Sequence, residues 1–157
     1  MGERALFDQI GEIIRGSTPP RLGHPHIQTR HNGVKAWFGD PAPQREHYEA
    51  QIIPAELAPG ARHHAIEIGF HAEHPAEPDN EAALTRLLTT EPAWRTDLGD
   101  EPRTGTFLGR TTWRRISETW PDTDLTDTDL TGPDIPFEIG VRLVDYIRAL
   151  EPHRKRV

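Results

Sequence analysis

Polar side chains that could bind a metal ion alternate with apolar ones along residues 46–53 and 63–74. Because successive side chains of a β-strand point to opposite faces, each segment predicts a strand with one polar and one apolar face. Imidazole and carboxylate groups are common ligands of divalent Zn, Mn, Fe and Ni. If the two strands pair, the sequence predicts such a metal site on their shared polar face, with the ligands His47, Glu49, Glu67 and His71.

Glu73 continues the same polar series and is the candidate catalytic acid or base. A carboxylate beside a bound metal ion can exchange protons with a substrate or water, which predicts a metal-dependent hydrolase or a nuclease-like enzyme. A nuclease pattern of an acid followed by Glu-x-Lys is incomplete, because Gln51 stands at the lysine position. The alternative is a solvated face on which histidine and glutamate are simply tolerated, and the strand register decides between the two.

Aromatic and amide side chains near this face are candidates for binding a ligand. An aromatic ring beside a guanidinium group offers stacking and charge to an anionic or aromatic molecule. Arginine stems also lie over tryptophan rings in ordinary surface packing, so both interpretations stay open. The face would receive a small molecule or a protein partner, including a second copy of the chain in a homodimer. The candidate residues are Trp37, Gln51, Trp113 and Arg115.

Composition excludes several other kinds of site. The 157 residues include no cysteine, so thiolate metal sites, disulfides and thiol nucleophiles are excluded. A formal net charge of -7 makes general binding of nucleic acid unfavourable. The sequence contains no phosphate-binding glycine loop, serine nucleophile elbow or zinc-protease helix motif. It also has no run of apolar residues long enough to cross a membrane and no signal-peptide pattern, so we expect a cytoplasmic protein.

The remaining patterns predict the elements that must position these side chains. Apolar residues with helical spacing predict helices over 3–15, 79–89, 91–98 and 137–150, and strand patterns occur at 34–38, 46–53, 63–74, 104–109 and 112–120. Proline and glycine predict loops at 17–33 and 121–134, and the basic residues 152–157 predict a frayed tail. This order predicts an α+β fold in a single domain, 1–157. We expect a two-layer sandwich in which helices cover one face of a mostly antiparallel sheet of about five strands.

The polar, tryptophan-containing face of the sheet is therefore the predicted functional surface. The leading expectation is a small ligand-binding, partner-binding or accessory domain, because enzyme motifs are absent and aromatic residues are present. The alternative is a metal-dependent enzyme that uses the histidines and glutamates of the same face.

Overall fold

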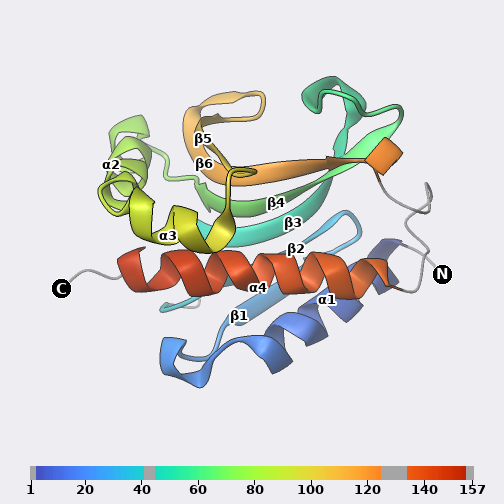
Figure 1. The fold of residues 1–157 in the computed structure, drawn as a ribbon, viewed down its shortest axis with the longest axis horizontal. Coiled ribbons are helices and arrows are strands. Elements are labelled where there is room, and N and C mark those ends of the chain that lie inside the picture. The colour runs from blue at the N-terminus through green and yellow to red at the C-terminus, as the bar shows by residue number, and fades with distance from the viewer. Residues whose placement is uncertain (1–2, 41–44, 125–133, 155–157) are drawn as a thin grey trace.

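One antiparallel sheet of six strands forms the centre of the computed structural model, and four helices pack against it (Figure 1). The structure describes residues 3–40, 45–124 and 134–154. The helices are α1 (Glu3–Ser17), α2 (Glu77–Leu88), α3 (Glu91–Leu98) and α4 (Ile135–Arg154). The strands are β1 (His26–Arg30), β2 (Gly33–Trp37), β3 (Glu46–Pro54), β4 (His64–Ala72), β5 (Arg103–Phe107) and β6 (Arg110–Pro121), in the sheet order β1-β2-β3-β4-β6-β5.

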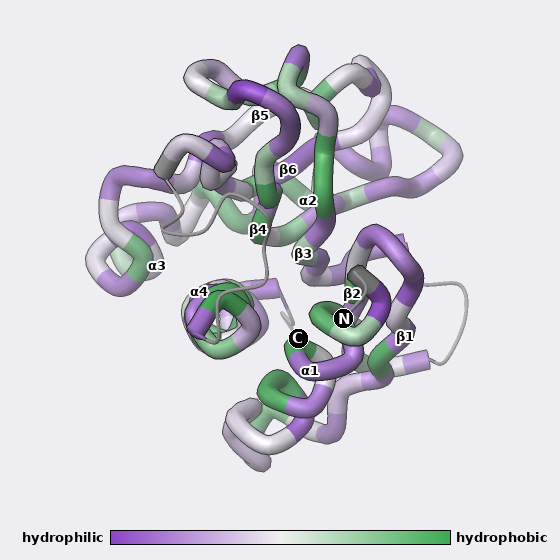
Figure 2. The backbone as a smooth tube through the Cα atoms, turned by 90° about the vertical axis from the view of Figure 1, so that its right-hand side faces the viewer, coloured by the Kyte–Doolittle hydropathy of each residue, from purple (hydrophilic) through white to green (hydrophobic). Residues whose placement is uncertain are grey.

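The predicted α+β class and antiparallel sheet are confirmed, and the main core lies between the sheet and the helices. Four large apolar side chains of β3 and β4 are at most 1% exposed: Tyr48, Ile66, Ile68 and Phe70. In Figure 2 α4 is seen nearly end-on, with α1 beside it and the central strands above. The face of the sheet that carries the histidines and glutamates is thereby directed away from this core.

The segment 17–33 was expected to be a loop, and this prediction is wrong for its second half. Residues His26–Arg30 form the edge strand β1, so the sheet has six strands and not about five. The strand pairs with β2 along its whole length, and its Ile27 side chain packs against the core beneath α1. This tertiary packing outweighs the turn signals of the neighbouring prolines and glycines.

The ends of the other elements differ from their predicted positions by a few residues. Helix α4 continues through Pro152 to Arg154, so residues 152–154 of the predicted frayed tail are helical. Arg154 is held by ion pairs with Glu151, at 2.8 Å, and with Glu46, at 3.4 Å. Of the predicted loop 121–134, Pro121 ends β6 and Asp122–Asp124 form a short 3-10 helix. Residues 125–133 and 155–157 lie outside the described part of the chain.

A second, smaller apolar cluster covers one end of the polar face. The 3-10 helix Ala55–Leu57 and the turn between β5 and β6 both lie over the sheet there, and their side chains Leu57 and Leu108 pack together with Ile53, Ala58 and Ala65. The polar face is therefore partly covered. It was expected to be open to solvent, a ligand or a partner.

Gly69 of β4 lies against the backbone of β6, and we expect alanine there to destabilise the protein. A Cβ atom at this position would overlap the carbonyl oxygen of Ile116 and the backbone of Ser117. Overpacking of this kind costs about 1–3 kcal/mol of unfolding free energy. Gly16, in α1, has open space around the position of a Cβ atom, so Gly16→Ala is the matched control. This substitution should raise the free energy of unfolding by about 0.5–1 kcal/mol. Equal stability of Gly69→Ala and the parent protein in urea unfolding would contradict this packing.

Candidate metal centre

The pairing of β3 with β4 brings the predicted polar residues together. In this register His47 lies opposite His71, Glu49 opposite Gly69 and Gln51 opposite Glu67. Glu73 follows the end of β4 on the same face, and its backbone N–H donates to the carbonyl oxygen of Arg45 at 2.7 Å. One ligand atom from each of four side chains lies within 4.8 Å of the other three. These side chains are His47, Glu49, His71 and Glu73, which we call the four-ligand group.

Four distances between ligand atoms of the four-ligand group lie near the ligand spacing of a tetrahedral ion. His47 Nε2 is 3.0 Å from Glu49 Oε1 and 3.6 Å from Glu73 Oε2. His71 Nδ1 is 3.1 Å from the same Glu49 oxygen and 3.2 Å from the same Glu73 oxygen. Ligands bonded to zinc at about 2.0–2.1 Å on the corners of a tetrahedron stand about 3.3–3.4 Å apart. These four distances are close to that spacing, and all four atoms lie within 4.8 Å of one another, so the group could hold one ion.

The orientation of His71 is the most specific feature of the centre. Its Nε2 atom lies 2.7 Å and 3.0 Å from the two carboxylate oxygens of Glu67, to which it donates a hydrogen bond. Its buried Nδ1 atom has no hydrogen-bond partner of acceptable geometry among the described residues. In a neutral imidazole, a proton on Nε2 leaves a lone pair on Nδ1. That lone pair is available to a metal ion, and a carboxylate behind the ring is the usual support of a metal-bound histidine.

The contact between Glu67 and His71 depends on the glycine between them. Residues four apart on a strand have Cα atoms about 13 Å apart, too far for most side chains to meet. Gly69 occupies the intervening position on the same face and has no side chain, so the two longer side chains can lean over it. The pattern Glu67-x-Gly69-x-His71 is thus the local sequence signal for this carboxylate–imidazole pair.

The centre is buried, so the alternative of a solvated face does not hold here. His47 and Glu49 are 1% and 2% exposed, and Glu67 and His71 are fully buried. The cover comes from the β5–β6 hairpin, where the ring of Phe107 packs edge-on against His71 with centroids 4.5 Å apart. Ionised groups this deep must be paired or must bind a metal ion.

Charge within the centre is compensated by several short contacts. Burial alone would raise the pKa of Glu49, but the close contacts and charges of His47 and His71 together outweigh it and hold that pKa well below its usual range. The pKa of Glu73 is also lowered, because its contact with His71 and the charges of His71 and His47 together outweigh its burial. Burial would lower the pKa of His71, but the charge of Glu67 and its other carboxylate contacts raise it well above its usual value. Arg30 contributes a further positive charge, 2.7 Å from Glu49 Oε2.

Two predicted residues lie just behind the four-ligand group. Glu67, predicted as a ligand, contacts His71 Nε2 on the side of the ring opposite the group. Gln51, predicted to bind a ligand, donates a hydrogen bond to Glu67 Oε1 at 3.0 Å. Glu73, predicted as the acid or base, instead belongs to the four-ligand group. The structure therefore brings all of these residues together. Glu73 lies in the four-ligand group, where Glu67 was predicted, and Glu67 lies behind His71.

The other three residues that were predicted to bind a ligand lie in different parts of the face. They are Trp37, Trp113 and Arg115. Trp113 lines a cavity of about 410 Å³ that also touches Glu49, Gln51 and Glu73. Trp37 lies outside this cavity, stacked on His26 with its indole N–H donating to the Asp40 carbonyl oxygen at 3.0 Å.

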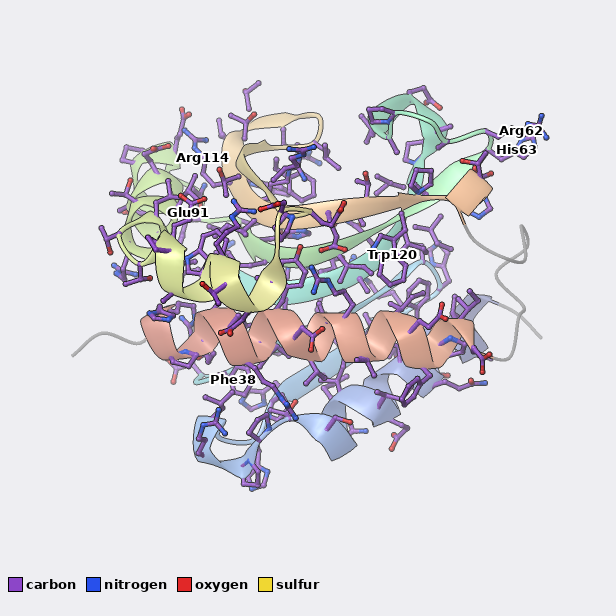
Figure 3. The ribbon with its side chains drawn as sticks, viewed as in Figure 1. Phe38, Arg62, His63, Glu91, Arg114 and Trp120 are labelled. Carbon is purple, nitrogen blue, oxygen red and sulfur yellow. The ribbon has the colours of Figure 1, made fainter. Side chains whose placement is uncertain are left out.

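Arg115, on β6 opposite His71, points toward a second cavity. Its Nη1 donates to the hydroxyl and carbonyl oxygens of Ser117, and burial lowers its pKa. The next arginine, Arg114, points to α2 and forms ion pairs with Glu77 and Glu81 (Figure 3).

Sequence reasoning missed two cations of the 410 Å³ cavity, Arg30 and Lys35. Arg30 belongs to the strand that was predicted to be a loop. Lys35 was detectable, since it alternates with the apolar Val34 and Ala36 and pairs with Glu49 across β2 and β3.

A scan against protein-family models finds no match, and searches of curated proteins and of solved structures find no significant similarity. None of the described helices is both long enough and apolar enough to span a membrane. The functional argument therefore depends on the geometry of the centre and its cavity.

Proposed function

We propose that this protein binds one divalent transition-metal ion through His47, Glu49, His71 and Glu73 and uses it to hold a small molecule in the adjoining cavity. The observation that carries the proposal is the buried Nδ1 atom of His71, which faces two carboxylates without an acceptable hydrogen bond while Glu67 holds the opposite nitrogen. A metal ion would use that lone pair and would neutralise the buried carboxylates.

The donor set favours zinc, with divalent iron, manganese and nickel as the other candidates. Two imidazole nitrogens suit transition metals better than calcium or magnesium, which prefer oxygen ligands. The absence of cysteine from the chain excludes thiolate sites. Four distances between ligand atoms are 3.0–3.6 Å, near the ligand spacing of a tetrahedral ion, the usual arrangement of zinc.

The cavity supports ligand binding at the metal ion. Glu49 and Glu73 belong to both the four-ligand group and the cavity wall, so a molecule in the cavity would lie next to the ion. Zinc can expand from four to five ligands to accept it. A hydrolase would need a further acid or base, because the carboxylate predicted for that role, Glu73, lies among the metal ligands. The geometry therefore favours binding over hydrolysis, and a protein partner or a homodimer stays a prediction.

Replacing His71 by alanine is expected to abolish metal binding. The measurement is zinc content by mass spectrometry after equilibrium dialysis, with protein purified without a chelator. We expect one ion per chain in the parent protein, and in His71→Ala a loss of affinity exceeding the 10- to 100-fold that removal of an outer-shell partner typically causes. His63→Ala is the matched control, because the side chain of His63 is exposed and lies outside the centre. Equal zinc content in both variants would overturn the proposed ligand set.

Replacing Glu67 by glutamine tests its role behind His71. Glutamine keeps the size of the side chain but removes the charge, so we expect zinc affinity to fall about 10- to 100-fold while the fold is retained. Glu56→Gln, at an exposed position of the 3-10 helix, should leave the affinity unchanged. Competition with a zinc-binding dye measures the zinc affinity of each variant. An unchanged affinity in Glu67→Gln would show that this carboxylate does not support the ligand.

A further inference from the structure

The 410 Å³ cavity beside the four-ligand group is lined by two kinds of side chain. Three are cations: Arg30, Lys35 and Arg110. The apolar residues are Leu57, Phe107, Leu108 and Trp113. A molecule that matched this lining would need both a negative group and an apolar body.

The cations are available to a ligand because most of their donors are not used within the protein. Lys35 and Arg110 form no ion pair with any carboxylate of the described residues. Arg30 uses its Nη2 atom on Glu49, but its buried Nε atom has no partner within the described part of the chain. An oxyanion can accept several charge-assisted hydrogen bonds from such groups.

The charge of the site specifies the charge of the ligand. With a divalent ion bound and both imidazoles neutral, the positive charges are two from the ion and three from Arg30, Lys35 and Arg110. The opposing carboxylates are Glu49, Glu67 and Glu73, so an excess of two positive charges remains. A phosphate monoester, which carries about two negative charges at neutral pH, matches this excess better than a carboxylate with one.

The apolar wall specifies the rest of the molecule. The rings of Phe107 and Trp113 contact each other edge-on with centroids 5.6 Å apart, and the guanidinium of Arg110 lies over the Trp113 ring at 4.5 Å. Aromatic rings that line a cavity favour planar apolar groups, which they contact by stacking or by their edges.

We infer that the cavity binds a phosphate monoester of a planar, apolar alcohol. The phosphoryl group lies between Lys35, Arg30 and the metal ion, and the planar group lies against Phe107 and Trp113. This inference rests on the proposed function, because without the ion the floor of the cavity is formed by carboxylates that repel a phosphoryl group.

Calorimetric titration of the zinc-loaded protein with phenyl phosphate tests the inference. We expect saturable binding of one molecule per chain, and binding of benzoate at least about 10-fold weaker because it has one charge fewer. Lys35→Gln and Arg110→Gln should each weaken phenyl phosphate about 10-fold. Arg86→Gln, at an exposed position of α2, is the matched control and should bind as the parent does. Trp113→Leu should remove most of the preference for phenyl phosphate over inorganic phosphate.

Zinc content, measured on each sample before and after titration, separates the two proposals. If every variant retains one zinc ion and phenyl phosphate does not bind, the inference is overturned and the metal site stands. Benzoate binding as tightly as phenyl phosphate would also overturn it. If the parent protein retains no zinc, the proposed function fails and the inference fails with it. Equal binding of phenyl phosphate to zinc-free protein would overturn the role given to the ion.

Discussion

Zinc at about a thousand times its dissociation constant is expected to raise the midpoint of thermal unfolding by about 8–16 °C. An ion that binds only the folded state at this concentration adds about 4 kcal/mol to the free energy of unfolding. In a domain of this length each kcal/mol shifts the midpoint by about 2–4 °C. The four ligands come from β3, β4 and the residue after it, so unfolding separates them and releases the ion.

Scanning calorimetry with and without zinc gives the shift directly. His71→Ala should lose nearly all of it, whereas His63→Ala should keep it, and the same concentration of magnesium should have little effect. A shift of equal size in His71→Ala would mean that zinc binds elsewhere on the protein.

The metal-free protein should be most stable between about pH 4.5 and 6.5, and its stability should fall on both sides. His71 has a raised pKa in the folded state, so its contribution is fully present below its unfolded value of about 6.5 and is lost as pH rises through the folded value. Glu49 and Glu73 have lowered pKa values, so their contribution is present above about 4.3 and is lost as pH falls.

Urea unfolding in the presence of a chelator, repeated across the pH range, measures this profile. In Glu67→Gln the loss on the alkaline side should be smaller and complete at lower pH, because the charge of Glu67 is the largest of the influences that raise the folded-state pKa of His71. Saturating zinc should remove the alkaline loss, since the ion takes the place of the proton on His71. A free energy of unfolding that does not change between pH 6 and pH 10 would contradict this electrostatic account.

The strands β3 and β4 were predictable because their side chains alternate over nine residues each. Alternation in one strand shows which of its residues share a face. When a second strand with the same alternation pairs with it, the polar residues of the two strands lie side by side. For this reason His47, Glu49 and His71 could be predicted from the sequence as candidate ligands of one site. Strand β1 was not predictable, because its few residues show little alternation and gain their stability from β2 and α1.

The roles of Glu67 and Glu73 depend on distances that no residue pattern specifies. Both lie on the same face as His71, but Glu67 reaches Nε2 across Gly69, whereas Glu73 lies 3.2 Å from Nδ1. Trp37 has the predicted side-chain parity, yet its ring stacks on His26 and does not reach the 410 Å³ cavity. The cover by the β5–β6 hairpin, which buries the centre, results from tertiary folding that alternation alone does not predict.

X-ray absorption spectroscopy at the zinc edge tests the central claim most directly. For the zinc-loaded parent protein we predict four nitrogen or oxygen neighbours at about 2.0–2.2 Å, with the outer-shell scattering of two imidazole rings. His47→Ala and His71→Ala should each lower zinc affinity, and the zinc that remains bound should show one ring fewer. A zinc ion without imidazole neighbours in the parent protein, or with two rings in both variants, would contradict the assignment of the centre.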